Sequence, residues 1–505
     1  MKNQKLAIGL GAAAVVVVGG VLVTAYSMGG KIEGNFKAQI DRANAQGLVQ
    51  GTVVSYDRGL FTSTAQTQWS MEKSGIPGHI TVDHQITHGP LPAGSAAKIV
   101  TQVRMDSASA DTNKELLAAL NGRPIMEVVS SFGWGNDSSH KLTSPEFSLT
   151  HGTDAITWGG MKADWSMSAD MRNIKGSTEN PSFILKSESD GKFMTLGRTT
   201  TVFDTRKLAD NKFWSGTAKM DIDSIAMESK GDEETKPSSF KLQKLVLDSD
   251  TVVKGETTDM PFKLTAKSVQ TDSFSGEDMV FDMVMRSIDT VWLNQAVEWS
   301  EQFSAEMTRK AQAIAKKSEA GAGADADADA DTDEEAEDGA EALSTAMAEV
   351  QQKMISSLPQ LLARKPELEI KRASIRTPEG VSEISALLAY AENAAAQGNP
   401  LMNVKFDLKA DLSKPMLSKL MSNKARSEYV ALMDSVEQKY DPAELSKAVT
   451  EATNERLQAL TANGLFKEKA DQLSTQISLA DGEIKINNEK MELGEAAAVL
   501  QGMSN

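Results

Sequence analysis

Apolar and polar residues alternate along much of the chain between residues 50 and 274. The longest run, Met161–Arg172, has an apolar residue at every odd position and a polar residue at every even one. Shorter runs of the same kind lie at 99–106, 218–223 and 262–267. A period of two is typical of strands with one buried and one solvated face. Clusters of Gly, Pro, Asn and Asp between the runs indicate turns, so the region predicts consecutive antiparallel strands.

A helical period replaces this alternation beyond residue 285. Apolar residues recur at helical spacing from Trp292 to Ile314, from Leu343 to Leu361, and again after Pro415. Strand patterns return at 368–376 and, across the turn Thr377-Pro378-Glu379-Gly380, at 381–391. Between strands and next to a tight turn, the alanine-rich second run is predicted to be the hairpin partner of the first.

Together these patterns predict an α+β fold. One long antiparallel sheet is expected from two blocks of strands, roughly 50–285 and 365–413 plus 474–487. The helices are expected to pack on its apolar face, because each amphipathic helix also has an apolar stripe to bury. Two features are left open: whether the helices cover that face fully, and whether its methionines form a core or line a groove.

The first thirty residues predict a membrane anchor. Lys2 and Lys5 precede an uncharged stretch, Leu6–Met28, whose 23 residues suffice to cross a bilayer as a helix. The two lysines place the N-terminus in the cytoplasm and the bulk of the chain in the periplasm, with the cell inner membrane as the location. The alternative is a cleavable signal peptide, for which Ala25-Tyr26-Ser27 would be the cleavage site.

Four regions follow from these patterns. Residues 1–30 form the cytoplasmic stub and anchor, 31–285 the mainly β periplasmic region, 286–364 two helices joined by a connector, and 365–505 an α+β C-terminal region. The connector, 319–341, holds eleven acidic residues and no basic one. It has few apolar residues and repels itself, so it is predicted to be disordered.

Composition removes several classes of function. The 505 residues include 53 basic and 70 acidic ones, and the net charge of −17 argues against a nucleic-acid partner. The chain has no cysteine, which excludes a disulfide scaffold, thiol catalysis and cysteine-ligated metal centres.

Candidate chemistry is sparse. Three of the five histidines, His79, His84 and His88, lie within ten residues of one predicted strand. Residues four apart on a strand are about 13 Å apart, too far to share a metal ion, so these histidines are predicted to lie on a polar sheet face. No nucleophile elbow, P-loop, dinucleotide fingerprint or zinc-protease motif occurs. The sequence therefore nominates no catalytic, cofactor-binding or metal-ligating residue and no cofactor.

The most distinctive local stretch surrounds Tyr56, Arg58, Gly59 and Phe61. It is predicted to be a strand, a tight glycine turn or bulge, and a second strand, with the two aromatic rings across from each other. Arg58 is expected to pair with Asp57 or a phosphate. Two interpretations remain: a membrane-proximal contact site for a partner, or a hairpin that simply stabilises the sheet.

This stretch also carries a family resemblance. The N-terminal anchor, Tyr56-Asp57-Arg58-Gly59 with Phe61 and Ser63 after it, and the closing hairpin 482–487 resemble the YdgA family of inner-membrane proteins of unknown function. The resemblance implies a Gram-negative source, a single-pass inner-membrane anchor and a large periplasmic part, and it supplies no catalytic residue. The Asp-Ala repeat at 325–331 departs from the family pattern.

The function predicted first is a non-enzymatic envelope protein that contacts a partner or supports envelope organisation. Its expected partners are the inner membrane, through residues 6–28, and a second copy or another envelope protein. The alternative is a lipid-binding or lipid-transfer module with an apolar β groove. A periplasmic hydrolase assembled from distant residues is the third interpretation.

Overall fold

The computed structural model describes most of the chain beyond residue 49. The described residues are 40–41, 44, 50–59, 61–70, 79–88, 95–105, 111–135, 137–188, 191–231, 237–304, 351–390, 400–435, 441–462 and 464–492. The predicted anchor Leu6–Met28 and the acidic connector 319–341 lie outside them. Within the described part, no helix has the length and apolarity needed to cross a membrane.

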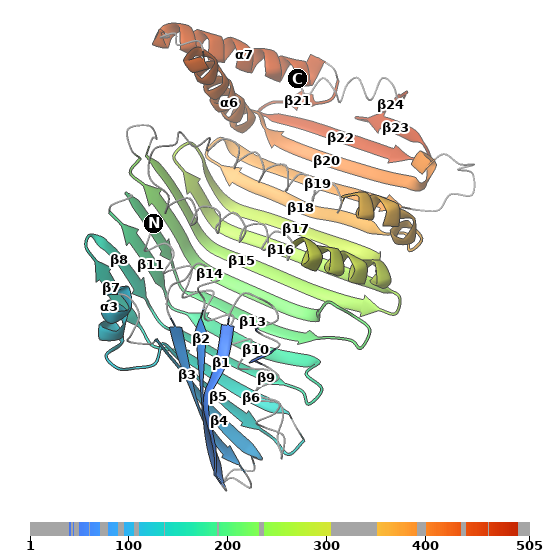
Figure 1. The fold of residues 1–505 in the computed structure, drawn as a ribbon. Helices are drawn as coiled ribbons and strands as arrows, with labels where there is room; N and C mark the ends of the chain where they lie inside the picture. Colours follow the sequence, from blue (N-terminus) through green and yellow to red (C-terminus); the bar gives the residue numbers. More distant parts are fainter. Residues whose placement is uncertain are drawn as a thin grey trace, which may run out of the picture. The chain divides into compact units, whose positions relative to one another are not determined.

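The chain divides into two compact units. Unit 1 comprises residues 1–237 and 294–356, and unit 2 comprises 238–293 and 357–505. Each is built on antiparallel strands (Figure 1). This confirms the predicted antiparallel meander, with helices in the minority.

Besides the parts of two helical segments that are described below, unit 1 contains in its described part fourteen strands and the short helix α3. They are β1 (Gln50–Arg58), β2 (Thr62–Ser70), β3 (His79–His88), β4 (Ala97–Met105), α3 (Asp111–Leu120), β5 (Met126–Phe132), β6 (Ser138–Ser144), β7 (Phe147–His151), β8 (Asp154–Trp158), β9 (Met161–Met167), β10 (Asn173–Asn180), β11 (Phe183–Ser187), β12 (Lys192–Leu196), β13 (Thr199–Arg206) and β14 (Ser215–Ser229).

The strands of unit 1 pair in chain order only at first. β1 to β6 pair successively, β6 then pairs with β9, and the sheet continues through β10 and β13 to β14. The second half of β14 pairs with β12, which leads back through β11 and β8 to β7. Consecutive pairs such as β6–β7 and β8–β9 are therefore long strands, each broken in the middle.

The breaks line up across the sheet. They fall at Pro145-Glu146, Gly159-Gly160, Pro181-Ser182 and Gly197-Arg198. Proline removes a ladder donor, and glycine tolerates the close approach that a bend requires. A side chain on Gly159 would lie 2.5 Å from the hydroxyl of Ser182. The aligned breaks form a crease that divides the broken strands into two halves.

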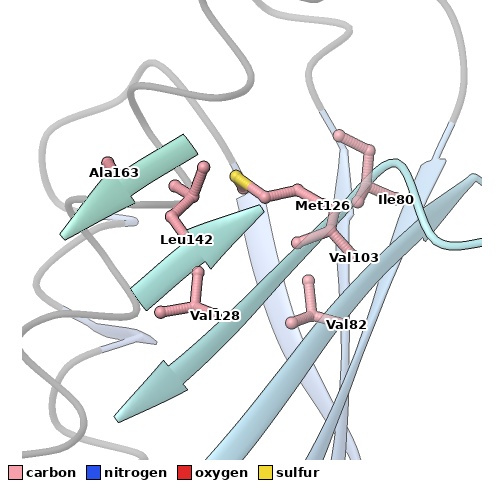
Figure 2. Packing of buried hydrophobic residues seen from close by; sticks show 7 residues of the cluster. All are labelled: Ile80, Val82, Val103, Met126, Val128, Leu142 and Ala163. Carbon is pink, nitrogen blue, oxygen red and sulfur yellow. The ribbon is translucent and has the colours of Figure 1, made fainter. Parts of the chain in front are cut away.

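The main core of unit 1 lies on one face of β3, β4, β5, β6 and β9. Its buried residues are Ile80, Val82, Val103, Met126, Val128, Leu142 and Ala163. Figure 2 shows Met126 beside Val103 of the neighbouring strand β4, with its sulfur directed toward the side of Leu142. A second core beyond the crease joins Leu116 and Leu120 of α3 to Phe147, Leu149 and Ile156. The first core includes Val103 and Ala163 of the predicted alternating runs, whereas helix α3 of the second core was not predicted.

One predicted strand is shorter than expected. The alternation of 161–172 continues to Arg172, but β9 ends at Met167. Asp170 accepts hydrogen bonds from the Ser168 hydroxyl at 2.6 Å and the Arg172 amide at 3.1 Å, and Met171 has a φ of 57°. The side-chain-to-backbone hydrogen bonds favour a turn here, so the last two apolar positions of the run do not belong to the sheet face.

Unit 2 has longer strands and two long helices. Its elements are β15 (Ser238–Lys254), β16 (Thr257–Thr271), β17 (Ser275–Asp289), β18 (Glu367–Thr377), β19 (Gly380–Tyr390), η2 (Pro400–Asn403), β20 (Val404–Ser413), α6 (Lys414–Ser435), α7 (Pro442–Ala462), β21 (Lys467–Lys469), β22 (Gln472–Ala480), β23 (Glu483–Ile486) and β24 (Glu489–Met491). Residues 290–304 and 351–362 are also helical, and each of these segments crosses a unit boundary.

The sheet of unit 2 is a simple meander. β15 to β20 pair in chain order, and β20 then pairs with β22 (Figure 1). The predicted hairpin at 368–391 is confirmed, because β18 and β19 pair around Thr377 and Gly380. β22 carries β21 and β23 on its other edge, and β24 pairs with β23.

Helices α6 and α7 pack on each other and on the last strands. Ala425, Leu445 and Val449 form the buried contact between the helices. Leu417, Leu457 and Leu460 pack against the buried cluster of Leu465, Phe466, Leu473, Ile477 and Ile486. The helices thus cover the apolar face at the β22–β23 end of unit 2.

Asp289 ties the end of β17 to the helical segments around it. Its carboxylate accepts hydrogen bonds from the Trp292 amide, the Gln360 side chain and Arg364 Nε at 2.8, 3.1 and 3.0 Å. Burial alone would raise the pKa of Asp289, but these bonds hold it below its ordinary value. Asp289 acts as the N-cap of the helix that begins at residue 290.

Candidate interaction site

The hairpin predicted around Gly59 is present. β1 and β2 pair from Gln50 opposite Ser70 to Arg58 opposite Ser63. The Gly59 amide donates a 2.7 Å hydrogen bond to the Thr62 carbonyl. A β-carbon at position 59 would lie 2.4 Å from that carbonyl oxygen, so only glycine fits. The irregularity in the ladder lies between Val53 and Ser55, inside β1 rather than at the glycine.

Tyr56 has a structural role. It lies opposite Ala65, not opposite Phe61 as the sequence predicted, because Phe61 precedes the first residue of β2. Tyr56 packs with Val53 and Trp69 against the buried pair Ile40 and Ala65. This contact fixes residue 40, at the start of the described chain, onto the hairpin.

Arg58 and Phe61 have a different environment. Both side chains are exposed, and Phe61 retains 64% of its accessible surface. Large apolar side chains that are this exposed at a turn do not stabilise the sheet they belong to. The four residues nominated from the sequence therefore divide, with Tyr56 and Gly59 building the hairpin and Arg58 and Phe61 on its surface.

Two more exposed aromatic side chains lie at turns of the same sheet end. Trp134, in the β5–β6 turn, is 66% exposed, and Trp214, at the start of β14, is 38% exposed. The hairpins β1–β2, β5–β6 and β13–β14 all have their turns at the same end of the sheet. Trp134 and Trp214 therefore lie at the same end as the β1–β2 turn. The sequence analysis missed these residues. The signal for Trp134 was its place between two glycines, Gly133 and Gly135.

The histidines form no metal site. His84 is buried and its Nδ1 lies 3.0 Å from the Thr101 hydroxyl, so the prediction of a polar sheet face is wrong for this residue. His84 lies on the face that carries Val82 and Ile86, because residues two apart on a strand share a face. No cluster of three metal-ligating side chains occurs among the residues that the structure describes.

His140 lies between Ser138 of its own strand, β6, and Ser130 of the neighbouring strand, β5. Its Nδ1 is 2.8 Å from the Ser130 hydroxyl, and its Nε2 is 2.9 Å from the Ser138 hydroxyl. The ring stacks on Trp165 at 5.0 Å and meets Phe132 edge-on at 6.0 Å. His140 and both serines are buried, so the Ser–His contacts are parts of the core.

Burial keeps both rings neutral. Desolvation lowers the pKa of His84 to about 4, with Asp83 acting in the opposite direction, and it lowers the pKa of His140 to about 4. A buried neutral ring that is hydrogen-bonded to hydroxyl groups can neither take up nor release a proton readily at neutral pH. The two histidines therefore specify packing rather than chemistry.

The most extensive feature is an apolar face on the unit 2 sheet. Strand pairing aligns side chains into rows that cross the sheet. One row consists of Met260, Met285, Leu368, Leu388, Phe406, Leu479, Ile484 and Met491. The next consists of Phe262, Met283, Ile370, Ala386, Leu408, Ile477 and Ile486. We call these two rows the apolar track; neither contains a charged or polar residue.

The apolar track is sealed at one end only. Ile477 and Ile486 are buried beside α6 and α7. The side chains of the track that lie on β16 to β19 are all partly exposed, and Leu388 keeps 46% of its accessible surface. The predicted packing of helices on the apolar face is thus found at the β22–β23 end, while the middle of the face stays accessible.

The reverse face of the same strands carries the charges. Arg286 pairs with Glu367 and, at 2.6 Å, with Glu369 across β17 and β18. Hydrogen bonding to Glu369 raises the pKa of Arg286 despite some desolvation. Arg372 pairs with Glu383 at 3.0 Å. The sheet therefore has one solvated face and one apolar face that its own chain covers in part.

Comparison with known proteins identifies the family. A family model described as bacterial protein of unknown function (DUF945) matches residues 3–494, nearly the whole chain. No curated protein and no solved structure matches the chain. The chain belongs to the bacterial protein family DUF945, whose function is unknown.

Proposed function

We propose that the protein is a non-enzymatic envelope protein that binds the acyl chain of a lipid along the apolar track of unit 2. The observation that carries this proposal is the partial exposure of the track on β16 to β19, where every side chain of both rows is apolar. A water-exposed apolar face costs free energy in proportion to its area. An apolar ligand that covers it is stabilised by the same amount.

The form of the track suits a linear ligand. The first row crosses eight strands, a length of roughly 34 Å at about 4.8 Å per strand spacing. The accessible part, from β16 to β19, covers three of these spacings, roughly 14 Å. An acyl chain spans half a bilayer core, about 15 Å, so the accessible part matches the length of one acyl chain. Met260, Met283 and Met285 are flexible and polarizable, which suits an adaptable apolar surface.

The location proposed is the bacterial inner membrane. Leu6–Met28 acts as a single-pass anchor, with the N-terminus in the cytoplasm and both units in the periplasm. The support is the length of the uncharged stretch and the position of Lys2 and Lys5 before it. A lipid-binding surface tethered in this way stays near its source of lipid.

A protein partner is the second candidate occupant of the track. Exposed apolar patches also mark protein interfaces. A partner from the envelope, or a second copy of the chain, would cover the same side chains around Leu388, as first predicted from the sequence. The acyl chain is preferred because both rows are apolar throughout, whereas protein interfaces have polar groups interspersed.

Mass spectrometry of bound lipid tests the proposal. A protease site inserted before residue 31 releases units 1 and 2 from the anchor after folding, and thus from the lipid around it. We expect phospholipid to remain bound to the released protein, and a Leu388→Glu variant to retain much less of it. Lys405→Glu is the matched control, since Lys405 is exposed on the reverse face of the adjacent strand.

Two results would overturn the proposal. One is released protein that carries no lipid although it keeps the melting temperature of the intact chain. The other is equal lipid content in the wild type and the Leu388→Glu variant. If the released protein carries no lipid but forms a stable complex with a second copy of the chain or with another protein, the protein partner is favoured instead.

A further inference from the structure

The three exposed aromatic side chains of unit 1 are placed in an unusual way. Among the described residues, Phe61, Trp134 and Trp214 are the only aromatic side chains in the exposed class. All three lie in turns at one end of one sheet. We propose that this turn end of unit 1, tipped by Phe61 and Trp134, sits in the interface of the same membrane that holds the anchor.

The spacing of the tips argues for a bilayer over a protein partner. Three strand spacings separate β2, next to Phe61, from β5, next to Trp134, roughly 14 Å, and five more separate β5 from β14, next to Trp214, roughly 24 Å. Binding energy at a protein interface concentrates in contiguous clusters that fill pockets. A bilayer interface has no fixed shape and accepts each aromatic ring separately.

The path of the chain brings the anchor to this end. The Asn44 side chain bonds the Gly51 amide and carbonyl at 2.6 and 2.9 Å, near the beginning of β1. Residue 40 packs against Ala65 and Tyr56, close to the turn. From residue 44 back to residue 40 the chain therefore runs toward the turn end.

The remaining distance is short enough. Twelve residue steps separate Met28, the last residue of the proposed anchor, from Ile40, and they span at most about 40 Å. Tyr56 lies three residues before Gly59, a distance of roughly 10 Å along the strand. A membrane that holds Leu6–Met28 is thus within reach of the aromatic tips. This step rests on the proposed anchor.

Charge near the tips is compatible with lipid headgroups. Arg58 in the first turn and Arg172 in the β9–β10 turn are both exposed. Guanidinium groups bind phosphate through paired hydrogen bonds. With Arg58 next to the Phe61 turn and Arg172 in a turn at the same end of the sheet, this end combines aromatic rings and arginines as a membrane-interface surface does, although the whole chain carries a net charge of −17.

The absence of cysteine from the chain makes the inference directly testable. Single cysteines at three positions carry a fluorophore in the full chain, reconstituted in phosphatidylcholine vesicles whose acyl chains bear a nitroxide quencher. Gly135→Cys places the fluorophore next to Trp134. A β-carbon at position 135 would have the Asp137 carboxylate as its near neighbour, at 3.3 Å. Thr153→Cys is the matched control, exposed in the β7–β8 turn at the opposite end of the strands. Ala14→Cys reports on the anchor.

We expect the probes at 135 and 14 to lose most of their emission and the probe at 153 to lose none. Quenching at 14 with no difference between 135 and 153 would overturn the inference and leave the anchor standing. An unquenched probe at 14 would overturn both. Combining Gly135→Cys with Phe61→Ser and Trp134→Ser should restore emission at an unchanged melting temperature. Quenching that persists in this variant would show that the aromatic tips do not hold the contact.

Discussion

The two units bury the apolar faces of similar antiparallel sheets to different degrees. In unit 1, seven side chains from five strands form a core in which every member is buried. In unit 2, the aligned side chains on β16 to β19 are partly exposed, and burial is confined mainly to the strands beside α6 and α7. The alternation of apolar and polar residues is equally clear in both, so periodicity shows which face is apolar but not what covers it.

The difference has a physical cause in strand length and cover. The strands of the unit 1 core are seven to ten residues long, whereas β15, β16 and β17 have 15 to 17. A broader face needs more covering surface. Helices α6 and α7 pack where the sheet ends, at β20 to β23. The uncovered part of the face is the part for which we propose a ligand.

The largest expected effect is on the sealed core. Leu142 is 3% exposed, so Leu142→Ala should lower the free energy of unfolding by about 2–5 kcal/mol, the cost of a cavity that the core cannot close. Urea unfolding of the full chain, followed by tryptophan fluorescence, measures this. A loss below about 1 kcal/mol, the scale of one methylene group, would mean that the unit 1 core is not sealed.

Acid should destabilise unit 1 through its two buried histidines. Both have a pKa of about 4 in the folded protein, against 6.5 for a free histidine. The unfolded chain therefore takes up protons first. Stability is full above pH 6.5 and falls as the pH drops toward 4, by up to about 1.4 kcal/mol per pH unit for each ring.

The control for this effect removes the titrating rings. Unfolding of the wild type and of a His84→Gln/His140→Gln variant is measured at several pH values between 7 and 4. The variant should be less stable at neutral pH but lose less stability on acidification. Parallel losses in both proteins would show that the carboxylates, not the histidines, set the acid sensitivity.

The matched substitution in unit 2 should have a smaller effect. Leu264 lies on the same face as the apolar track, opposite Phe281, and is partly exposed. Leu264→Ala should cost about 1 kcal/mol, because an open site leaves no closed cavity and loses only part of the transfer free energy. If the same urea titration gave a loss equal to that of Leu142→Ala, the contrast between the units would be broken.

The smallest effect is expected at the most exposed position of the track. Leu388→Glu should change the free energy of unfolding by less than about 0.5 kcal/mol in lipid-free protein, as most surface substitutions do. In the lipid-bound protein the same change should lower the melting temperature, because a ligand that binds the folded state stabilises it. Equal melting temperatures with and without lipid would remove position 388 from the ligand site.

Much of the fold could be predicted because the local signals agree. The hairpin at 368–391 was predicted from one turn and the strands around it, although its alanines favour a helix. The end of β9 was missed, because the pattern of 161–172 says nothing of the bonds that Asp170 makes with its neighbours. Sequence shows which residues alternate, while a turn made by polar side chains depends on competing hydrogen bonds.

The candidate sites were harder to predict, since they depend on residues far apart in the chain. Gly59 was found from its own turn, but the association of Phe61 with Trp134 requires the pairing of β2 through β5. The hydrogen bonds of His140 could not be predicted, because Ser130 and Ser138 lie eight residues apart along the chain. Ser130 comes next to His140 only when β5 pairs with β6. The pattern of a single strand cannot show such cross-strand contacts.

Site-specific photocrosslinking tests the central claim most directly, namely that the apolar face of unit 2 is open to an acyl chain. A benzophenone amino acid replaces Leu388 on the track or Lys405 on the reverse face of the neighbouring strand. After irradiation of cells, mass spectrometry of the purified protein identifies the adducts. The account predicts lipid adducts at 388 and none at 405. Adducts with this chain's own residues at 388, and no lipid, would contradict it and show that the face is an ordinary core.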